Sequence, residues 1–250
     1  MKTVLITGCS TGFGREAAVT FVERGWNVIA TMRTPNPDVL PASDRLRILP
    51  LDVTDSESIE AARAAAGDID VLVNNAGIGL AGVVEGTPME LVRETFETNV
   101  FGLIQVTRAF LPTLRERGAG TVINVSSSTT LKTLPLVAVY TATKAAVNAF
   151  TECLDLELAP LGVRARVVLP GQAPTTAFAA NAQSVLDRVE TPDAYADFVQ
   201  TVVQRMLNPP ADAPLTHASD VAEAIWRAAT DPDCPRVLPA GADAVAFAAG

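Results

Sequence analysis

The sequence predicts one α/β domain over residues 1–250, with a doubly wound parallel sheet of about seven strands and helices on both faces. Two observations indicate this fold class. Short β-branched runs alternate with longer helical patterns along the chain, which is typical of βαβ units. Most of the short runs are continuously apolar, as expected for strands that helices cover on both sides.

The strand candidates are bounded by turn residues and are rich in Val, Ile and Leu. With 48% hydrophobic residues among 250, the chain can bury one sizeable core around such a sheet. In chain order the strands are expected at Thr3–Thr7, Trp26–Met32, Leu46–Leu51, Val71–Asn75, Gly120–Ser126, Val163–Leu169 and Arg236–Leu238.

Residues that start and stop helices mark the segments between the strands. Gly25 is expected to close a first helix over Arg15–Arg24, because glycine readily adopts the left-handed backbone at a helix end. Two more helices are expected to open with capping boxes, formed by Thr54 with Glu57 and by Thr87 with Glu90, the latter with Pro88 at its first position.

Two long apolar helices are expected in the middle of the chain. The helix that opens near Pro88 should run to about Arg117, where Gly118 ends it, and a second covers about Tyr140–Leu161. Both are apolar on more than one side, so they can pack against the sheet and against a second copy of the chain. We therefore expect a homodimer or homotetramer.

Residues 172–216 interrupt the alternation of strands and helices. We interpret this segment, which is rich in Ala, Thr, Pro and Gln, as a substrate-binding lid. His217, just before a helix expected to open at Ser219, is assigned a capping or surface role rather than a contact with substrate. The apolar positions in the amphipathic middle of the segment are Val185, Leu186, Val189, Tyr195, Phe198 and Val202.

Composition excludes several classes of function. A net charge of -9 and a pI near 4.7 repel a phosphate backbone, so nucleic acid is not an expected partner. Cys9, Cys153 and Cys234 lack CxxC spacing and the chain has 1 histidine, so neither a disulfide framework nor a metal site is expected. The sequence contains no leader pattern and no apolar run of the roughly 18 residues that a membrane span needs. We expect a cytoplasmic protein that does not bind membranes.

A glycine-rich turn, TGCSTGFG from Thr7 to Gly14, joins the first strand to the first helix. Backbone N–H groups and the helix dipole can hold a pyrophosphate there. Gly8 permits the turn, Gly12 lets phosphates approach the backbone, and Gly14 lets the helix lie close to the strand. The position after a strand favours a dinucleotide site over a merely tight turn. The other residues of this predicted site in the turn are Ser10, Thr11 and Phe13.

The end of the second strand indicates which nicotinamide cofactor would bind. A carboxylate there would bind the adenine ribose hydroxyls of NAD(H), but Met32 stands in its place and Arg33 follows. A guanidinium can clamp the ribose phosphate of NADP(H), with Ser10 and Thr11 across from it. The alternative is that Arg33 is a solvated loop residue.

Small and polar residues follow the third and fourth strands. Asp52, with Val53 after it, can accept a hydrogen bond from the adenine amino group or from loop N–H groups, and both interpretations stay open. Asn74 is expected to bridge strands rather than touch the ligand. The residues expected to lie against the adenosine side of the dinucleotide are Asn75, Ala76 and Gly77.

The catalytic candidate is the pair Tyr140 and Lys144, which share one face of a helix. Lowering a phenol pKa from near 10 by about three units asks for about 4 kcal/mol, which an ammonium in a partly desolvated cleft can supply. Tyr140 would then exchange a proton with substrate near neutral pH. Such spacing usually marks a solvated helix face, but the chain has only 2 tyrosines, so chance is a weaker explanation.

Ser127 and Asn99 complete the candidate site. Ser127 ends the fifth strand, where its hydroxyl could orient a substrate oxygen, although Ser126 or Ser128 could take that role or simply bond the loop backbone. Asn99 lies inside a predicted helix, where asparagine is an indifferent helix former, and it could hold a water near Lys144.

The motifs together resemble those of the classical short-chain dehydrogenase/reductase family. They are TGxxxGxG at Thr7–Gly14, NNAG at Asn74–Gly77, the Asn–Ser–Tyr–Lys set, and Pro170 with Gly171, and the resemblance covers Met1 to Thr176. It implies a Rossmann fold and a catalytic tetrad of Asn99, Ser127, Tyr140 and Lys144, with Lys144 also binding the nicotinamide ribose. It further implies that Thr175 and the backbone after Pro170, at Gly171, hold the carboxamide.

Within that family, the segment Ala30–Arg33 and the ending Pro239–Ala244 look like the branch of estradiol- and retinol-dehydrogenase-like enzymes. The resemblance implies a preference for NADP(H) and an apolar substrate. Three residues on the substrate side depart from the usual family pattern: Leu131, Ala173 and Pro174. The shape of the substrate-binding wall is therefore expected to differ from that of the family.

We therefore predict an NADP(H)-dependent oxidoreductase that moves a hydride between nicotinamide C4 and an apolar ketone or aldehyde, or a secondary alcohol. One alternative is a non-catalytic NADP(H)-binding redox sensor, although such proteins typically lose the tyrosine or the lysine. A second is an NAD-dependent alcohol dehydrogenase of the same fold. Related epimerases and dehydratases carry a larger C-terminal domain than this chain has after its sixth strand.

Overall fold

A computed structural model describes residues 1–173, 188–208, 210 and 213–250. Seven parallel strands form one sheet in the order β3-β2-β1-β4-β5-β6-β7. The predicted doubly wound α/β domain is confirmed, and every predicted strand is present within two residues of its expected bounds. The strands are β1 Thr3–Ile6, β2 Asn27–Met32, β3 Leu46–Pro50, β4 Val71–Asn74, β5 Gly120–Val125, β6 Val163–Pro170 and β7 Val237–Ala240.

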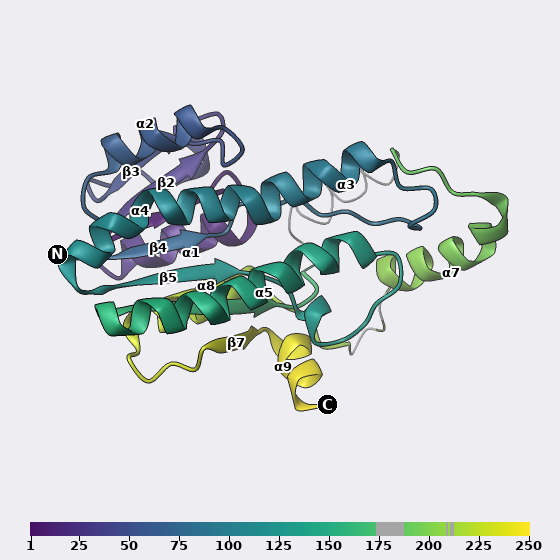
Figure 1. Cartoon of the computed structure of the whole chain (residues 1–250). Helices are drawn as coiled ribbons and strands as arrows, with labels where there is room; N and C mark the ends of the chain where they lie inside the picture. Colours follow the sequence, from purple (N-terminus) through teal and green to yellow (C-terminus); the bar gives the residue numbers. More distant parts are fainter. Residues whose placement is uncertain (174–187, 209, 211–212) are drawn as a thin grey trace.

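Helices cover both faces of the sheet (Figure 1). They are α1 Gly12–Glu23, α2 Ser56–Ala66, α3 Met89–Phe96, α4 Leu103–Arg117, α5 Ala138–Leu158, α7 Ala196–Leu207, α8 Ala218–Thr230 and α9 Ala242–Ala249. Short 3-10 turns lie at Pro37–Val39, Ser128–Thr130, Ala159–Leu161 and Asp193–Tyr195. The predicted helix to Leu161 thus ends as α5 at Leu158 and continues as a 3-10 turn.

Each face of the sheet has its own hydrophobic core, because successive strand residues point to opposite sides. Val4 and Ile6 of β1 pack with Phe21 of α1 and Ile225 of α8. Leu5, between them in sequence, packs on the other face with residues of α2, α4 and α5. Burial on both sides explains why the strands are continuously apolar.

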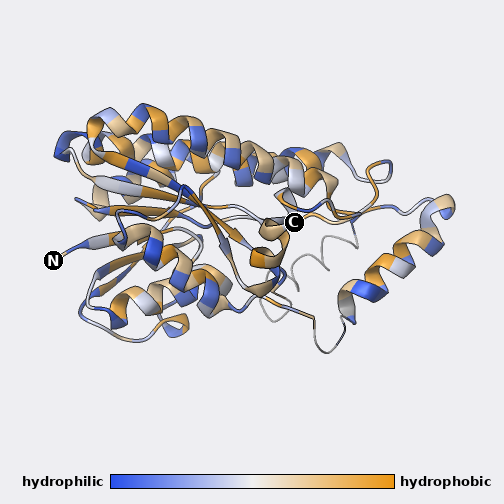
Figure 2. Ribbon diagram, turned by 90° about the horizontal axis from the view of Figure 1, so that it is seen from below, coloured by the Kyte–Doolittle hydropathy of each residue, from blue (hydrophilic) through white to orange (hydrophobic). Residues whose placement is uncertain are grey.

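The strand order reverses beside β1, whose neighbours are β2 on one side and β4 on the other. In open parallel sheets a crevice forms at such a switch point, outside the carboxyl ends of the strands. Helix α7 lies beyond the carboxyl ends of the strands (Figures 1 and 2). The loops that follow β1, β4, β5 and β6 lie at the same end of the sheet, where such a crevice would form.

Both predicted capping boxes are wrong. Asp55, not Thr54, caps α2 by accepting a hydrogen bond from the N–H of Glu57 at 2.9 Å. The Thr54 hydroxyl instead donates to Asp52 at 2.7 Å. Asp55 competes well for the cap because its short carboxylate can accept from an N–H two residues ahead.

The second predicted capping box fails for a similar reason. Pro88 is the residue before the first turn of α3, which begins at Met89, and not its first residue. The Thr87 hydroxyl donates to the carbonyl oxygen of Val83 at 2.7 Å, so it does not cap the helix. The Thr87 side chain, predicted to cap the helix, is instead hydrogen-bonded within the preceding loop.

The long helix predicted to end at Arg117 is three segments in line (Figure 1). Helix α3 runs into a π-helical stretch at Glu97–Gly102, and α4 follows to Arg117, with Gly118 left-handed after it at φ 61°. π-Helical turns widen a helix locally and are frequent at functional sites. Asn99, a predicted site residue, lies in this one.

Residues 172–216 are described in part. Val202 of α7 packs against Val83 and Leu136, so α7 lies beside the loops that follow β4 and β5. His217 precedes α8, which begins at Ala218 rather than Ser219, and its N–H donates to Asp220 at 2.8 Å. The predicted capping role of His217 is confirmed. Val185 and Leu186, predicted apolar positions of the segment, lie outside the described residues.

Among the residues that the structure describes, no helix is both long and apolar enough to cross a membrane. Within the same residues, no three His, Cys, Asp or Glu side chains gather as metal ligands would. Cys9, Cys153 and Cys234 are free thiols.

Candidate active site

The carboxyl ends of the strands bring most predicted site residues to one edge of the sheet. The glycine turn from Gly8 to Gly14 follows β1, Arg33 follows β2, Asp52 and Val53 follow β3, Asn75 to Gly77 follow β4, and Ser127 follows β5. Tyr140 and Lys144 lie on α5, Asn99 on the π-helical stretch, and Pro170 and Gly171 at the end of β6. Thr175 and Pro174 lie outside the described residues.

The glycine turn is held by the residues after β4. The Asn75 side-chain amide donates to the carbonyl oxygens of Thr7 at 2.9 Å and Gly8 at 3.1 Å. A Cβ on Gly14 would overlap both the Gly8 carbonyl oxygen and this amide, and Gly8 has a φ of 73° that side chains disfavour. Glycine is thus required where the turn packs against β4, as well as where a ligand would approach.

The first turn of α1 fits a bound anion. Its N-cap residue Thr11 is extended, and no described side chain caps the N–H groups of that turn. Helix α1 carries no acidic residue in the first turn, so its positive dipole end is not neutralised locally. Ser10 and Thr11 are exposed beside it. These features suit the phosphates of a dinucleotide.

The Asp52 carboxylate is hydrogen-bonded within its own loop. One carboxylate oxygen accepts from the Thr54 N–H at 2.9 Å and from the Thr54 hydroxyl at 2.7 Å. These two hydrogen bonds lower the pKa of Asp52, and the charge of the nearby Arg33 adds to the effect. Arg33, directly after β2, is exposed.

Asn74 bridges strands, as predicted. Its amide nitrogen donates to Asn124 of β5 at 2.9 Å and to Thr107 of α4 at 2.9 Å, all of them buried. In the next turn, the Thr7 hydroxyl accepts from the N–H groups of Asn75 at 2.9 Å and Ala76 at 3.0 Å. The amide-rich segment after β4 therefore fixes the crevice between β1 and β5.

Ser127, Tyr140 and Lys144 form a buried cluster, with exposed fractions of 7%, 8% and 5%. The side chains of Ser127 and Tyr140 are hydrogen-bonded to each other. The Lys144 ammonium lies 5.7 Å from the centre of the Tyr140 ring and donates to the carbonyl oxygen of Val125 at 3.0 Å. The i and i+4 positions on α5 thus face the end of β5 together, not the solvent.

Ser126 and Ser127 have different surroundings. The Ser126 hydroxyl donates to the carbonyl oxygen of Lys144 at 3.0 Å and so ties β5 to α5. Ser127 accepts from the N–H of Thr129 at 3.2 Å while its side chain meets Tyr140. Of the three candidates that the sequence left open, Ser127 is the one that contacts the tyrosine.

The expected lowering of the Tyr140 pKa is wrong for the protein alone. Burial raises the pKa of Tyr140 to about 12, although the hydrogen bond with Ser127 acts in the opposite direction. Burial also lowers the pKa of Lys144 to about 8. Both shifts have one physical cause, because a low-dielectric surrounding disfavours the charged form of each group.

Asn99 joins three parts of the site. Its side chain accepts from the N–H of Ile78 at 2.8 Å and donates to the carbonyl oxygen of the same residue at 2.9 Å. It also donates to Thr143 of α5 at 3.1 Å. A Cβ on Gly77 would stand 3.1 Å from the Asn99 oxygen and 3.5 Å from the Lys144 nitrogen, so both groups border the same point.

An apolar wall beside Tyr140 was not predicted from the sequence. Leu80 and Leu91 are buried against Tyr140, and Val137, Val139 and Val189 pack at the edge of this group. Leu80 comes soon after the NNAG motif, which could have drawn attention to it. The surroundings of Tyr140 on this side are therefore apolar.

Comparison with known proteins identifies the family. The model of the short chain dehydrogenase family matches residues 2–185. The uncharacterized oxidoreductase YusZ of Bacillus subtilis is 38% identical over 213 residues, which cover 81% of this chain and 76% of that protein. Human retinol dehydrogenase 8 is 35% identical over 185 residues, covering 70% of this chain and 60% of that protein.

Solved structures agree. A short-chain dehydrogenase from Streptomyces avermitilis is 35% identical, with a TM-score of 0.84 over 100% of this chain and 91% of that one. A short chain dehydrogenase from Burkholderia cenocepacia J2315 in complex with NADP is 28% identical, with a TM-score of 0.78 over 100% of this chain and 94% of that one. The chain therefore belongs to the short-chain dehydrogenase family of oxidoreductases.

Proposed function

We propose that this protein is an NADP(H)-dependent oxidoreductase that interconverts an apolar ketone or aldehyde and the corresponding alcohol. The observation that carries the proposal is the buried contact between Ser127 and Tyr140, with Lys144 beside them. This cluster lies at the same edge of the sheet as a helix N-terminus suited to phosphates. When bound, the cofactor supplies or accepts the hydride.

The protonation states of the cluster favour reduction. Because its pKa is raised to about 12, Tyr140 is neutral near pH 7 and can donate its proton to a carbonyl oxygen that gains a hydride. Ser127, bonded to the tyrosine, can hold that oxygen in place. Lys144, with a pKa of about 8, stays mostly cationic near neutral pH and can stabilise the phenolate that proton donation leaves.

The preference for NADP(H) rests on the residues that face the adenosine end. The chain has Met32 where an NAD(H) site would have a carboxylate, Arg33 directly after it, and exposed hydroxyls at Ser10 and Thr11 in the glycine turn. The Burkholderia relative with bound NADP supports this choice of cofactor. The apolar wall at Leu80 and Leu91 supports a hydrophobic substrate.

A spectrophotometric panel tests the proposal. Purified protein is mixed with NADPH or NADH and a series of aryl ketones, long-chain aldehydes, steroids and retinoids, and with the alcohols and oxidised cofactors for the reverse reaction. We expect turnover of at least one apolar pair, faster with NADPH. Binding of NADPH in a fluorescence titration without turnover of any pair would instead indicate a non-catalytic sensor, and equal use of NADH would contradict the cofactor assignment.

A further inference from the structure

Asp243 is a buried carboxylate far from the catalytic cluster in sequence. It lies in the first turn of α9 and is 4% exposed. One of its oxygens accepts from the hydroxyl of Thr216 at 2.6 Å, and the other accepts from the backbone N–H of Gln172 at 2.6 Å. Gln172 and Thr216 are the first and last residues of the segment that the sequence marks as a lid.

The two ends of the segment are also bound to each other. The Thr216 N–H donates to the carbonyl oxygen of Gln172 at 3.0 Å. The Thr216 hydroxyl oxygen accepts from the Gly171 N–H at 3.1 Å. The chain thus leaves the sheet after β6 and returns before α8 at one point, with the carboxylate of Asp243 bonded to both arms.

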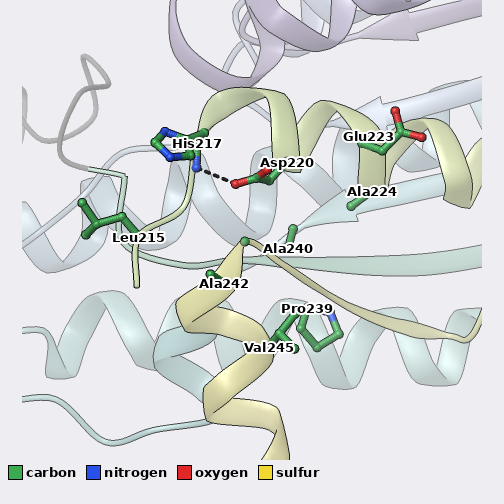
Figure 3. Close-up of a pocket in the computed structure, with 10 residues that line it drawn as sticks. Leu215, His217, Asp220, Glu223, Ala224, Pro239, Ala240, Ala242 and Val245 are labelled. Atoms are coloured by element: carbon green, nitrogen blue, oxygen red, sulfur yellow. Dashed lines mark hydrogen bonds between the residues drawn. The ribbon is translucent and has the colours of Figure 1, made fainter. Parts of the chain in front are cut away.

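Two glycines leave room for this arrangement. A Cβ on Gly171 would overlap the Asp243 carboxylate, and a Cβ on Gly241 would overlap the Thr216 hydroxyl. Gly241 also has a φ of 99°, which disfavours other residues. Figure 3 shows Leu215 and His217, the neighbours of Thr216, beside the turn that carries Ala240 and Ala242. The approach is close enough that a methyl group on either glycine would displace the carboxylate or its partner.

The point where Gln172, Thr216 and Asp243 meet lies at the end of β6, next to β5, which leads to Ser127. Strand β6 pairs with β5 as far as Val168 opposite Val125, and the Ser126 N–H donates to the Val168 carbonyl oxygen at 2.8 Å. Gly171 follows β6 directly, and Ser127 follows Ser126. A shift at the base of the segment therefore reaches the residues beside the catalytic serine through only a few bonds.

We infer that Asp243 is a positioning residue: by binding Gln172 and Thr216 together, it sets where these two residues and the end of β6 lie beside the strand end that carries Ser127. The kinetic part of this inference rests on the proposed function. The carboxylate can accept from both groups through charge-assisted hydrogen bonds, which are stronger than those to a neutral amide. An asparagine would keep one acceptor and turn its N–H2 group toward the Thr216 oxygen, whose single proton would then go to the carbonyl oxygen of Ala240 at 3.0 Å.

The first arm of the test uses hydrogen exchange and needs no activity. Asp243→Asn keeps the side-chain size, and Asp70→Asn is the matched control, because Asp70 also accepts from a backbone N–H, that of Thr3, and from a side chain, Arg117, at 2.7 Å each. Asp70 directly precedes β4 and so lies at the amino ends of the strands, opposite the end that carries Ser127. We expect amide exchange at Gly171, Gln172 and Thr216 to accelerate about tenfold or more in Asp243→Asn only. Unchanged exchange there would overturn the inference.

The second arm uses kinetics with the best substrate of the panel. We expect kcat/KM to fall about tenfold or more in Asp243→Asn, because small displacements near a reacting centre are costly. The dissociation constant of NADPH should change less than kcat/KM does, because its phosphates would bind at the glycine turn and only its carboxamide end would meet Gly171. Thr216→Val should reproduce the loss and Thr216→Ser should restore activity, as the hydroxyl is the required group.

The outcomes separate the inference from the proposed function. Wild-type kcat/KM in an Asp243→Asn protein whose exchange is accelerated would overturn the positioning role. If the wild-type chain turns over no substrate, the proposed function fails, and the exchange arm still decides whether Asp243 closes the base of the segment. Circular dichroism and thermal midpoints of all four variants show whether each one is folded.

Discussion

The glycine turn and the buried cluster of Ser127, Tyr140 and Lys144 lie at the same end of the sheet but differ in their exposure to water. Ser10, Thr11 and Arg33 are exposed and would meet the charged end of a dinucleotide. Tyr140 and Lys144 are buried, and burial moves the pKa of each toward its neutral form. Exposed donors can bind phosphates at little cost in the free energy of unfolding. Burying ionisable groups lowers that free energy, but it shifts their pKa values and so sets their protonation states.

The difference predicts separable effects of mutation. Changes in the buried cluster should alter turnover and the stability of the fold, because these groups are desolvated and bonded to one another. Changes in the exposed turn should alter cofactor affinity with little effect on stability. A mutation in one region that produced the effect expected of the other would contradict this division.

Apart from loss of the Tyr140 hydroxyl itself, the largest effect is expected at Ser127. Removing its hydroxyl in Ser127→Ala takes away a hydrogen bond to Tyr140 and should lower kcat about 10²–10³-fold, as loss of one oriented donor typically does. Ser128→Ala is the control, since Ser128 is the next residue and is also buried. Steady-state kinetics should show near wild-type turnover for the control. Equal losses in both variants would assign the effect to packing of the loop.

A smaller effect is expected on stability at Lys144. Its pKa is about 8 in the folded protein, below its usual 10.5, so the unfolded chain binds more protons between these values and wild-type stability rises with pH through that window. Lys144→Met removes this dependence. Relative to the variant, the wild type should gain about 2–3 kcal/mol in free energy of unfolding between about pH 6 and pH 10.

Urea unfolding of both proteins at the two pH values measures this gain. Tyr140 is present in both, so its own titration above its usual pKa largely cancels in the difference. A stability difference between the two proteins that does not change with pH would mean that the Lys144 ammonium is not desolvated in the fold.

The smallest effect is expected at Arg33. Arg33→Ala should weaken NADPH about five- to tenfold and NADH much less, because only NADPH carries the extra phosphate and the site is exposed to screening by salt. Arg63→Ala is the control, since Arg63 is exposed on α2 and pairs with Glu60. Fluorescence titrations with both cofactors give the ratio. Equal weakening of NADPH and NADH would rule out this role for Arg33.

Local patterns were enough to predict the strands, the glycine turn and the spacing of Tyr140 and Lys144. Each of these depends on residues close together in sequence, so apolar runs, turn residues and helix periodicity identify them. The caps of α2 and α3 were misassigned, because Asp55 and Thr87 follow local turn geometry that the motif does not describe.

Three features required the structure. The π-helical turn around Asn99 has no sequence pattern of its own. The raised pKa of Tyr140 depends on burial by side chains from several elements, which the spacing of two residues does not reveal. The contact of Asp243 with Gln172 joins residues 71 positions apart, and periodicity carries no information over that distance.

The most direct test of the account is the turnover of Tyr140→Phe measured beside its affinity for NADPH. The variant keeps the ring that packs on Leu80 and Leu91 and loses only the hydroxyl that meets Ser127. If Tyr140 is the proton donor, kcat should fall about 10²–10⁴-fold while the dissociation constant of NADPH stays near its wild-type value. Near-normal turnover in Tyr140→Phe would contradict the account.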